Sequence, residues 1–263
     1  MNLFHYTKFE NLTNIIRNEV DEHGETRNYL SFLLTYYGDF DDPLEGKPCR
    51  NLLKKIYGND IKQDIWSSYI LSLCKEPDVL PLWKEYANDA TGLVLELDTD
   101  VFTFGKLKKC IYDPEEKKHI SDIILNKLVL CQEKHNHAIS RYYKAVSISH
   151  NLHELSNEST LRSSERSEAL SIVEPAICFK DEHYDYEEET RLICSGHTSM
   201  FERVKGIRNY ILVDRLLIEE PIESLKGIYI GPRLGKSAEN TVNEYLKLIG
   251  LSEIPVKRTG LHM

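Results

Sequence analysis

CFKDEHYDYEEETRLIC, residues 178–194, is the stretch around which we organise the rest of the chain. If residues 186–194 form a strand, the two-residue period of a strand places Glu187, Glu189 and Arg191 on one face. Two carboxylates and a guanidinium in a row suit a binding or catalytic site, because buried charges must be paired or hydrogen-bonded. A solvated edge strand that carries a surface salt bridge explains the same pattern.

Length and composition indicate a globular protein with an acidic surface. The chain has 263 residues, 41% hydrophobic and 29% charged, which allows one large domain or two small ones. A net charge of −9 argues against a general nucleic-acid binder, which needs a basic face. Because no charged-then-apolar leader opens the chain and no apolar run reaches about 18 residues, we expect a cytoplasmic protein that does not contact a membrane.

The cysteines and histidines do not form a recognisable metal motif. The six cysteines, at positions 49, 74, 110, 131, 178 and 194, include no CxxC pair, so we expect free buried thiols in a reducing compartment. His135, His137, His150 and His153 are metal-ligand types, but no further cysteine or acid stands at a clear spacing from them. We therefore expect solvated histidines and no bound metal.

Periodicity predicts an α+β fold, with a mixed or mostly antiparallel split sheet and flanking helices. A polar segment rich in Ser, Glu and Arg, residues 147–167, predicts a mobile or weakly helical connection. Because the blocks on either side have too few strands to stand alone, we expect one sheet system built from both. Residues 29–34 form a second apolar run. The expected strands are 3–7, 68–74, 93–97, 109–112, 176–179, 186–194, 209–213, 227–231 and 253–257. The expected helices are 8–20, 52–57, 78–86, 114–145 and 238–248.

Other candidate site residues are dispersed along the chain. They comprise His5 and Tyr6 near the start, Asp42 and Glu45 in an acidic loop, Trp83 and Tyr86, and Arg233 with Lys236 before a helix N-terminus. A helix N-terminus with nearby cations suits a phosphate group, although ordinary turn chemistry explains the Gly-Pro-Arg sequence as well. Each of the other residues also has a plain structural explanation in packing or capping.

Taken in order, several segments resemble a bacterial family, domain of unknown function 2971. The resemblance covers nearly the whole chain except residues 132–168. It departs from the family pattern at Asp41, where Asn is usual, and at Thr190, where Trp or Tyr is usual. The matching elements are His5-Tyr6-Thr7, residues 40–45, Leu80-Pro81 with Trp83, Tyr86 and Gly92, Phe179-Lys180, residues 186–191, and residues 230–233.

The order of these elements is also similar to that of ADP-ribosyltransferases, which implies NAD as co-substrate and no metal. By this resemblance, Glu189 holds the nicotinamide ribose and stabilises the oxocarbenium-like charge. Glu187 orients or deprotonates the acceptor, and His5 hydrogen-bonds the adenosine ribose. Residues 1–263 then form one ADP-ribosyltransferase-like domain, with a helical insertion and mobile connection at about 114–170.

The same resemblance implies roles for the remaining candidates. Tyr6, Trp83 or Tyr86 stacks on the nicotinamide, and Tyr6 is also counted among the catalytic residues. Arg191 or Arg233 binds the pyrophosphate, since a guanidinium matches phosphate geometry. Asp42 and Glu45 contact the substrate.

Three classes of function follow from these residues. The first is an NAD-consuming transferase acting as a toxin or anti-phage effector, with a neighbouring defence-system protein as a further partner. Its acceptor stays open among protein, nucleic acid and a small molecule, and water as acceptor would make it an NAD glycohydrolase. The second is a nucleotide sensor without turnover. The third is a metal-dependent phosphoesterase or nuclease, whose ligands would be Asp41, Asp42, Glu45, Glu187 and Glu189.

Overall fold

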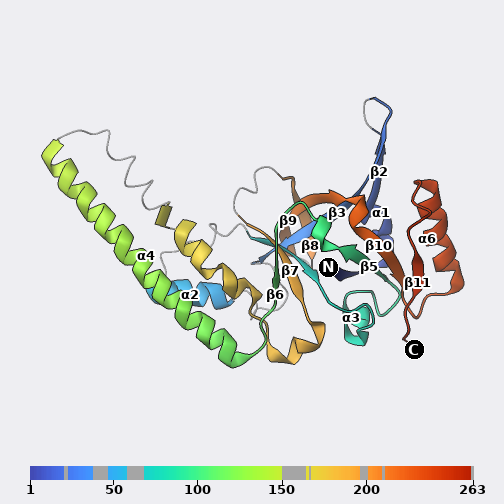
Figure 1. Cartoon of the computed structure of the whole chain (residues 1–263), viewed down its shortest axis with the longest axis horizontal. Helices are drawn as coiled ribbons and strands as arrows, with labels where there is room; N and C mark the ends of the chain where they lie inside the picture. Colours follow the sequence, from blue (N-terminus) through green and yellow to red (C-terminus); the bar gives the residue numbers. More distant parts are fainter. Residues whose placement is uncertain are drawn as a thin grey trace. The chain divides into compact units, whose positions relative to one another are not determined.

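The structure, a computed structural model, describes residues 1–20, 23–37, 47–57, 68–149, 164–165, 167–195, 201–208 and 211–261. Its contacts divide the chain into two compact units. The sheet unit comprises Met1–Asp39, Ser67–Cys110 and His183–Met263. The helical unit comprises Phe40–Trp66 and Ile111–Glu182. Helices and open, mostly antiparallel sheets occur together (Figure 1), so the expected α+β class is confirmed.

The first sheet of the sheet unit has the strand order β1-β5-β10-β11. The first two pairings are antiparallel, and β10 runs parallel to β11. Both faces of β5 are buried, because Leu95 packs into the main core and Val94 into a second cluster. This explains the continuous apolar sequence of β5. The strands are β1 (Asn2–Thr7), β5 (Leu93–Asp98), β10 (Leu225–Ile230) and β11 (Val256–Arg258).

The second sheet has the order β6-β7-β4-β3-β9-β8, with β2 also paired to β3, and all of these pairings are antiparallel. It pairs N-terminal strands with C-terminal ones, β3 with β9 and β4 with β7, which confirms the expected shared sheet system. The strands are β2 (Ile16–Val20), β3 (Thr26–Tyr36), β4 (Tyr69–Leu73), β6 (Lys106–Lys109), β7 (Thr190–Cys194), β8 (Arg203–Arg208) and β9 (Ile211–Pro221).

Apolar side chains from both sheets share one hydrophobic core. Leu95 of β5, Phe32 of β3 and Leu216 of β9 belong to this cluster and are nearly inaccessible to solvent. The helix α6 (Lys236–Leu248) adds Val242 and Leu246 to it. Since full burial of such a side chain is worth about 1.5–3 kcal/mol, this core is the main source of stability in the sheet unit.

The second cluster of the sheet unit lies under the short helix α3 (Leu80–Glu85) and contains Tyr6, Trp83 and Val94. Short 3₁₀ helices complete this unit. They are η1 (Phe9–Asn11), η5 (Thr99–Val101), η8 (Glu182–Glu187, whose first residue falls in the helical unit) and η10 (Ile222–Ser224).

The helical unit is built on α4 (Pro114–Ser149), the long green helix in Figure 1, which packs against α2 (Lys47–Tyr57). Its start matches the expected one, since Pro114 occupies the first turn and Asp113 Oδ1 accepts a hydrogen bond from Glu116 N at 2.7 Å. Residues 167–173 are also helical and continue into η7 (Glu174–Cys178). Among the described helices, none has the length and apolar character needed to cross a membrane.

The predicted helix over residues 8–20 is wrong. After η1, α1 (Leu12–Ile15) forms a single turn, and the chain then turns into β2. In β2, Ile16 pairs with Leu30 and Val20 with Thr26 of β3. The helical spacing of apolar residues is satisfied by the single turn, and pairing with β3 overrides it beyond Ile16.

Other boundaries near the decisive stretch also need correction. Residues 176–179 are not a strand, because the 3₁₀ helix η7, with Pro175 in its first turn, extends from Glu174 to Cys178. The predicted strand 186–194 begins only at Thr190, since Glu188 adopts a left-handed conformation with φ of 40°. The strand predicted at 109–112 lies at 106–109, and β8 was not predicted. The connection predicted at 147–167 falls largely outside the described residues.

We predict that Gly92→Ala destabilises the protein. A methyl group at Gly92 would collide with the carbonyl oxygen of Thr7 and lie 2.8 Å from that of Ala87, and both are backbone atoms that cannot move aside. We expect a loss of about 1–3 kcal/mol in urea denaturation. Gly206→Ala in β8 is the matched control, because its added methyl group meets only ordinary contacts from 3.4 Å outwards. Equal stability of the two variants would contradict the prediction.

Candidate functional site

Glu187, Glu189 and Arg191, here called the β7 cluster, lie at the start of β7. The three residues are 4%, 3% and 0% exposed, respectively. Arg191 Nε donates to Glu189 Oε1 at 3.0 Å, and Arg191 Nη2 donates to Glu189 Oε2 at 3.2 Å. This bidentate geometry is the strongest form of a carboxylate–guanidinium pair. The alternative of a solvated edge strand is therefore wrong for these side chains.

The backbone before β7 explains how both carboxylates are buried although the strand is shorter than predicted. The 3₁₀ helix η8 ends at Glu187, and Glu188 turns through a positive φ of 40°. The Glu188 side chain is 53% exposed and lies 3.4 Å from Lys75 Nζ. Glu189 then joins the sheet edge, where its carbonyl oxygen accepts a hydrogen bond from Cys110 N at 2.8 Å. The left-handed Glu188, with its exposed carboxylate, thus stands between two buried carboxylates.

Cys74, directly after β4, lies beside the β7 cluster. Burial raises the pKa of its thiol, and the negative charges of Glu187 and Glu189 raise this pKa further. The thiol donates to the carbonyl oxygens of Phe4 and Glu76 at 3.4 and 3.3 Å. A thiol held protonated in this way is a poor nucleophile.

His5 lies on β1 next to β4. Its Nδ1–H donates to the carbonyl oxygen of Ser72 at 3.2 Å, and its ring packs edge-on against Phe32 at 5.6 Å. Ser72 is the register partner of Arg191 across the β4–β7 pair, so β4 links His5 to the β7 cluster. Burial lowers the pKa of His5 below its ordinary value of 6.5. The ring is therefore neutral at pH 7, with Nε2 as a hydrogen-bond acceptor.

Tyr6 and Trp83 belong to a different environment from His5. They lie in the second hydrophobic cluster, with ring centroids 5.3 Å apart. The Tyr6 hydroxyl donates to Glu76 O at 3.0 Å and accepts from Val79 N at 3.1 Å, while Trp83 Nε1 donates to Pro77 O at 2.8 Å. Trp83 is fully buried, so in this structure its ring packs on protein and the described arrangement does not expose it for stacking.

Arg233 and Tyr86 are accessible residues of the sheet unit. Arg233 follows β10, is 44% exposed and forms an ion pair with Asp89. Tyr86 follows α3 and is 41% exposed. The ion pair with Asp89 engages the Arg233 guanidinium away from the β7 cluster. Asp42 and Glu45, like Asp41, lie outside the described residues, so their predicted substrate contacts stay predictions.

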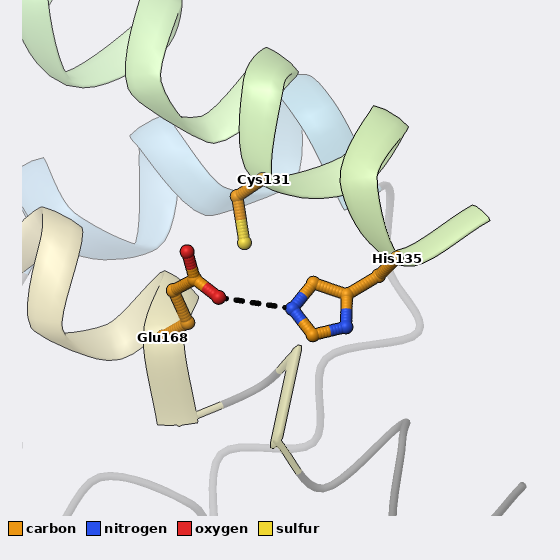
Figure 2. Close-up of side chains that lie close together, drawn as sticks. All are labelled: Cys131, His135 and Glu168. Carbon is orange, nitrogen blue, oxygen red and sulfur yellow. Dashed lines mark hydrogen bonds and ion pairs between the residues drawn. The ribbon is translucent and has the colours of Figure 1, made fainter. Parts of the chain in front are cut away.

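The helical unit contains a cluster of three side chains, Cys131, His135 and Glu168, that the sequence analysis missed. His135 is 4% exposed, so the expectation of a solvated histidine at this position is wrong. Its Nε2 lies 3.0 Å from Glu168 Oε2, and Cys131 stands one helical turn before it (Figure 2). The available signal was the spacing of Cys131 and His135, since residues four apart share one face of a helix. His150 and His153 lie outside the described residues.

All six cysteines are free thiols as expected, and five of them are buried.

Residues 82–192 match the family described as "Protein of unknown function (DUF2971)", which supports the family resemblance drawn from the sequence motifs. The matched stretch contains Trp83, the β7 cluster and α4, while His5 and Arg233 lie outside it. No curated protein and no solved structure matches the chain.

We predict that Glu189 and Arg191 stabilise the fold only when both are present. Arg191→Met leaves the Glu189 carboxylate buried without this partner and should cost about 3–5 kcal/mol in urea denaturation. The double variant Glu189→Gln/Arg191→Met should regain a large part of that loss. Lys75→Met, which breaks an exposed pair with Glu188, is the control and should cost at most about 1 kcal/mol. If Arg191→Met and the double variant are equally stable, the coupling between the two residues is refuted.

We predict that His5 makes the protein less stable as the pH falls. Because burial holds the pKa of folded His5 below 6.5, the unfolded chain takes up this proton first. Stability should therefore fall from about pH 6.5 down to the lower folded pKa and level off below it. Thermal unfolding between pH 8 and pH 5 should show a shallower pH dependence for His5→Asn than for the wild type. His119→Asn, at an exposed position on α4, should keep the wild-type dependence.

Proposed function

We propose that this protein is an NAD-consuming, ADP-ribosyltransferase-like enzyme and that the β7 cluster carries its chemistry. The observation on which this rests is the burial of two carboxylates, Glu187 and Glu189, beside Arg191 at the start of β7. The motif order in the sequence, an early histidine and a late Glu-x-Glu, supports the same assignment. His5, linked to the cluster through Ser72 of β4, supplies the early histidine.

The proposed reaction breaks the bond between C1′ of the ribose and the nicotinamide nitrogen. Nicotinamide leaves with the bonding electron pair, and positive charge builds on C1′ and the ring oxygen. A fixed carboxylate in a place with little water stabilises that charge, which is usually the largest contribution to catalysis. The acceptor then forms a bond to C1′ and loses its proton to a second carboxylate. Two adjacent buried carboxylates match these two tasks.

The hydrogen bonds divide the tasks between the residues. Both Glu189 oxygens accept from Arg191, so this carboxylate is rigidly oriented, as stabilisation of the ribosyl cation requires. The guanidinium offsets part of its charge, and Glu187 adds a second negative charge at the same place. We assign the proton transfer to Glu187. His5, neutral at pH 7, would accept a hydrogen bond from a ribose hydroxyl through Nε2.

The metal-dependent alternative has less support at the β7 cluster. A divalent ion would compete with Arg191, which already occupies both oxygens of Glu189. The acidic loop that would complete such a site lies outside the described residues.

With water as the acceptor, the proposed chemistry depletes NAD, and NAD depletion suits a toxin or an antiviral effector.

We predict that the purified protein releases nicotinamide from NAD labelled in the adenine moiety, or transfers the label to a component of cell lysate. Glu189→Gln and Glu187→Gln should each lower the rate at least a hundredfold, because each removes a charge that acts in the transition state. Comparing the two variants with water and with lysate as acceptor separates cation stabilisation from proton transfer. A reaction in the presence of a chelator should proceed unchanged.

The matched control is Glu188→Gln, which changes the intervening carboxylate, 53% exposed on the surface. It should keep the wild-type rate. Thermal unfolding of every variant shows whether a lost rate reflects lost folding, since Glu189→Gln also disturbs the buried pair. If the folded wild-type protein neither binds nor cleaves NAD, alone or with lysate, the assignment is wrong. If Glu187→Gln and Glu189→Gln both leave the rate unchanged, the chemistry takes place outside the β7 cluster.

A further inference from the structure

We propose that Cys131, His135 and Glu168 form a binding site for a divalent transition-metal ion of the zinc class. This proposal concerns the helical unit and does not depend on the proposed function of the sheet unit. The three side chains point toward one another, two from α4 and one from the helical residues 167–173 (Figure 2).

The distances suit a metal ion. Cys131 Sγ, the His135 nitrogen and the Glu168 carboxylate oxygen all lie within 4.8 Å of one another. Bond lengths of about 2.0–2.3 Å around a tetrahedral zinc ion place neighbouring ligand atoms roughly 3.3–3.8 Å apart. His135 Nε2 and Glu168 Oε2 stand 3.0 Å apart, so a small separation of these two groups admits the ion.

The donor set favours zinc over magnesium or calcium. Thiolate and imidazole are the ligands of borderline-soft transition ions, whereas magnesium and calcium prefer oxygen. Cys131 and His135 are 3% and 4% exposed, so two of the three ligands are shielded from water. Three protein ligands leave the fourth tetrahedral position to water or another group.

The surroundings hold the carboxylate ligand in place. Lys134 Nζ donates to Glu168 Oε2 at 2.7 Å, and His135 Nε2 lies 3.0 Å from the same oxygen. On binding, the Cys131 thiol releases its proton to solvent and the sulfur forms the metal bond. His135 binds through the Nε2 lone pair and carries its proton on Nδ1.

A plain histidine–carboxylate hydrogen bond explains the contact between His135 and Glu168 but leaves Cys131 without a part in it. The thiol points at the same centre, and its contact with the backbone oxygen of Glu165, at 4.0 Å, is long. A metal ion gives all three side chains one function. It would join α4 to the helix that carries Glu168, 33 residues beyond His135, and so stabilise the helical unit.

We predict that the reduced, chelator-treated full-length chain binds one equivalent of Zn²⁺ in calorimetry. Co²⁺ should bind at the same stoichiometry and produce a sulfur-to-cobalt charge-transfer absorption, which reports thiolate ligation in the wild type itself. Zn²⁺ should raise the melting temperature, because an ion that binds only the folded state stabilises it. Mg²⁺ should produce neither effect.

Three variants test the ligands one at a time. Cys131→Ser should abolish the charge-transfer band, and His135→Asn and Glu168→Gln should weaken Zn²⁺ binding at least tenfold. Two matched controls, His119→Asn on the exposed surface of α4 and Cys110→Ser in the sheet unit, should bind as the wild type does. A wild-type protein that binds no Zn²⁺, or a band that persists in folded Cys131→Ser, overturns the proposal. Unchanged affinity in Glu168→Gln removes Glu168 from the site, and with it the three-ligand proposal.

Discussion

The antiparallel pairing of β4 with β7 is the constraint on which the candidate site depends. It joins residues more than a hundred positions apart, and its register sets Ser72 opposite Arg191. On one side of β4, the Ser72 carbonyl oxygen holds the imidazole of His5, and on the other side β7 presents the buried Glu189–Arg191 pair. A register slip by one residue would turn Arg191 toward the hydrophobic core that Leu192 now occupies.

Burial of the Glu189–Arg191 pair carries a cost in free energy as well as a gain. Removing a carboxylate and a guanidinium from water costs several kcal/mol for each ion, and hydrophobic residues of similar volume often stabilise a fold as well or better. Glu187 is a second buried carboxylate at the same place, and groups of buried ionisable side chains of this kind occur at functional sites as well as in structural ion-pair networks. The surrounding hydrophobic core of both sheets supplies stability that offsets the cost of this burial.

The two units carry different kinds of chemistry. The sheet unit holds carboxylates, a guanidinium and a neutral histidine, which suits charge stabilisation on an organic substrate. The helical unit places a thiol, an imidazole and a carboxylate at one point, which suits a metal ion. Because the two sets of side chains share no residue, each proposal can fail without the other, and variants in one unit serve as controls for the other.

Local patterns in the sequence determined the α+β class, the positions of β1, β4, β5 and β10, the start of α4 at Asp113-Pro114 and the choice of Glu187, Glu189 and Arg191 as a group. Tertiary structure alone decided the rest. Pairing with β3 converted residues 16–20 from an expected helix into a strand, and the left-handed turn at Glu188 shortened β7. Burial of Trp83, and the approach of Glu168 to Cys131 and His135, also depend on contacts between distant segments. Sequence periodicity reports one element at a time, so it cannot report which faces meet.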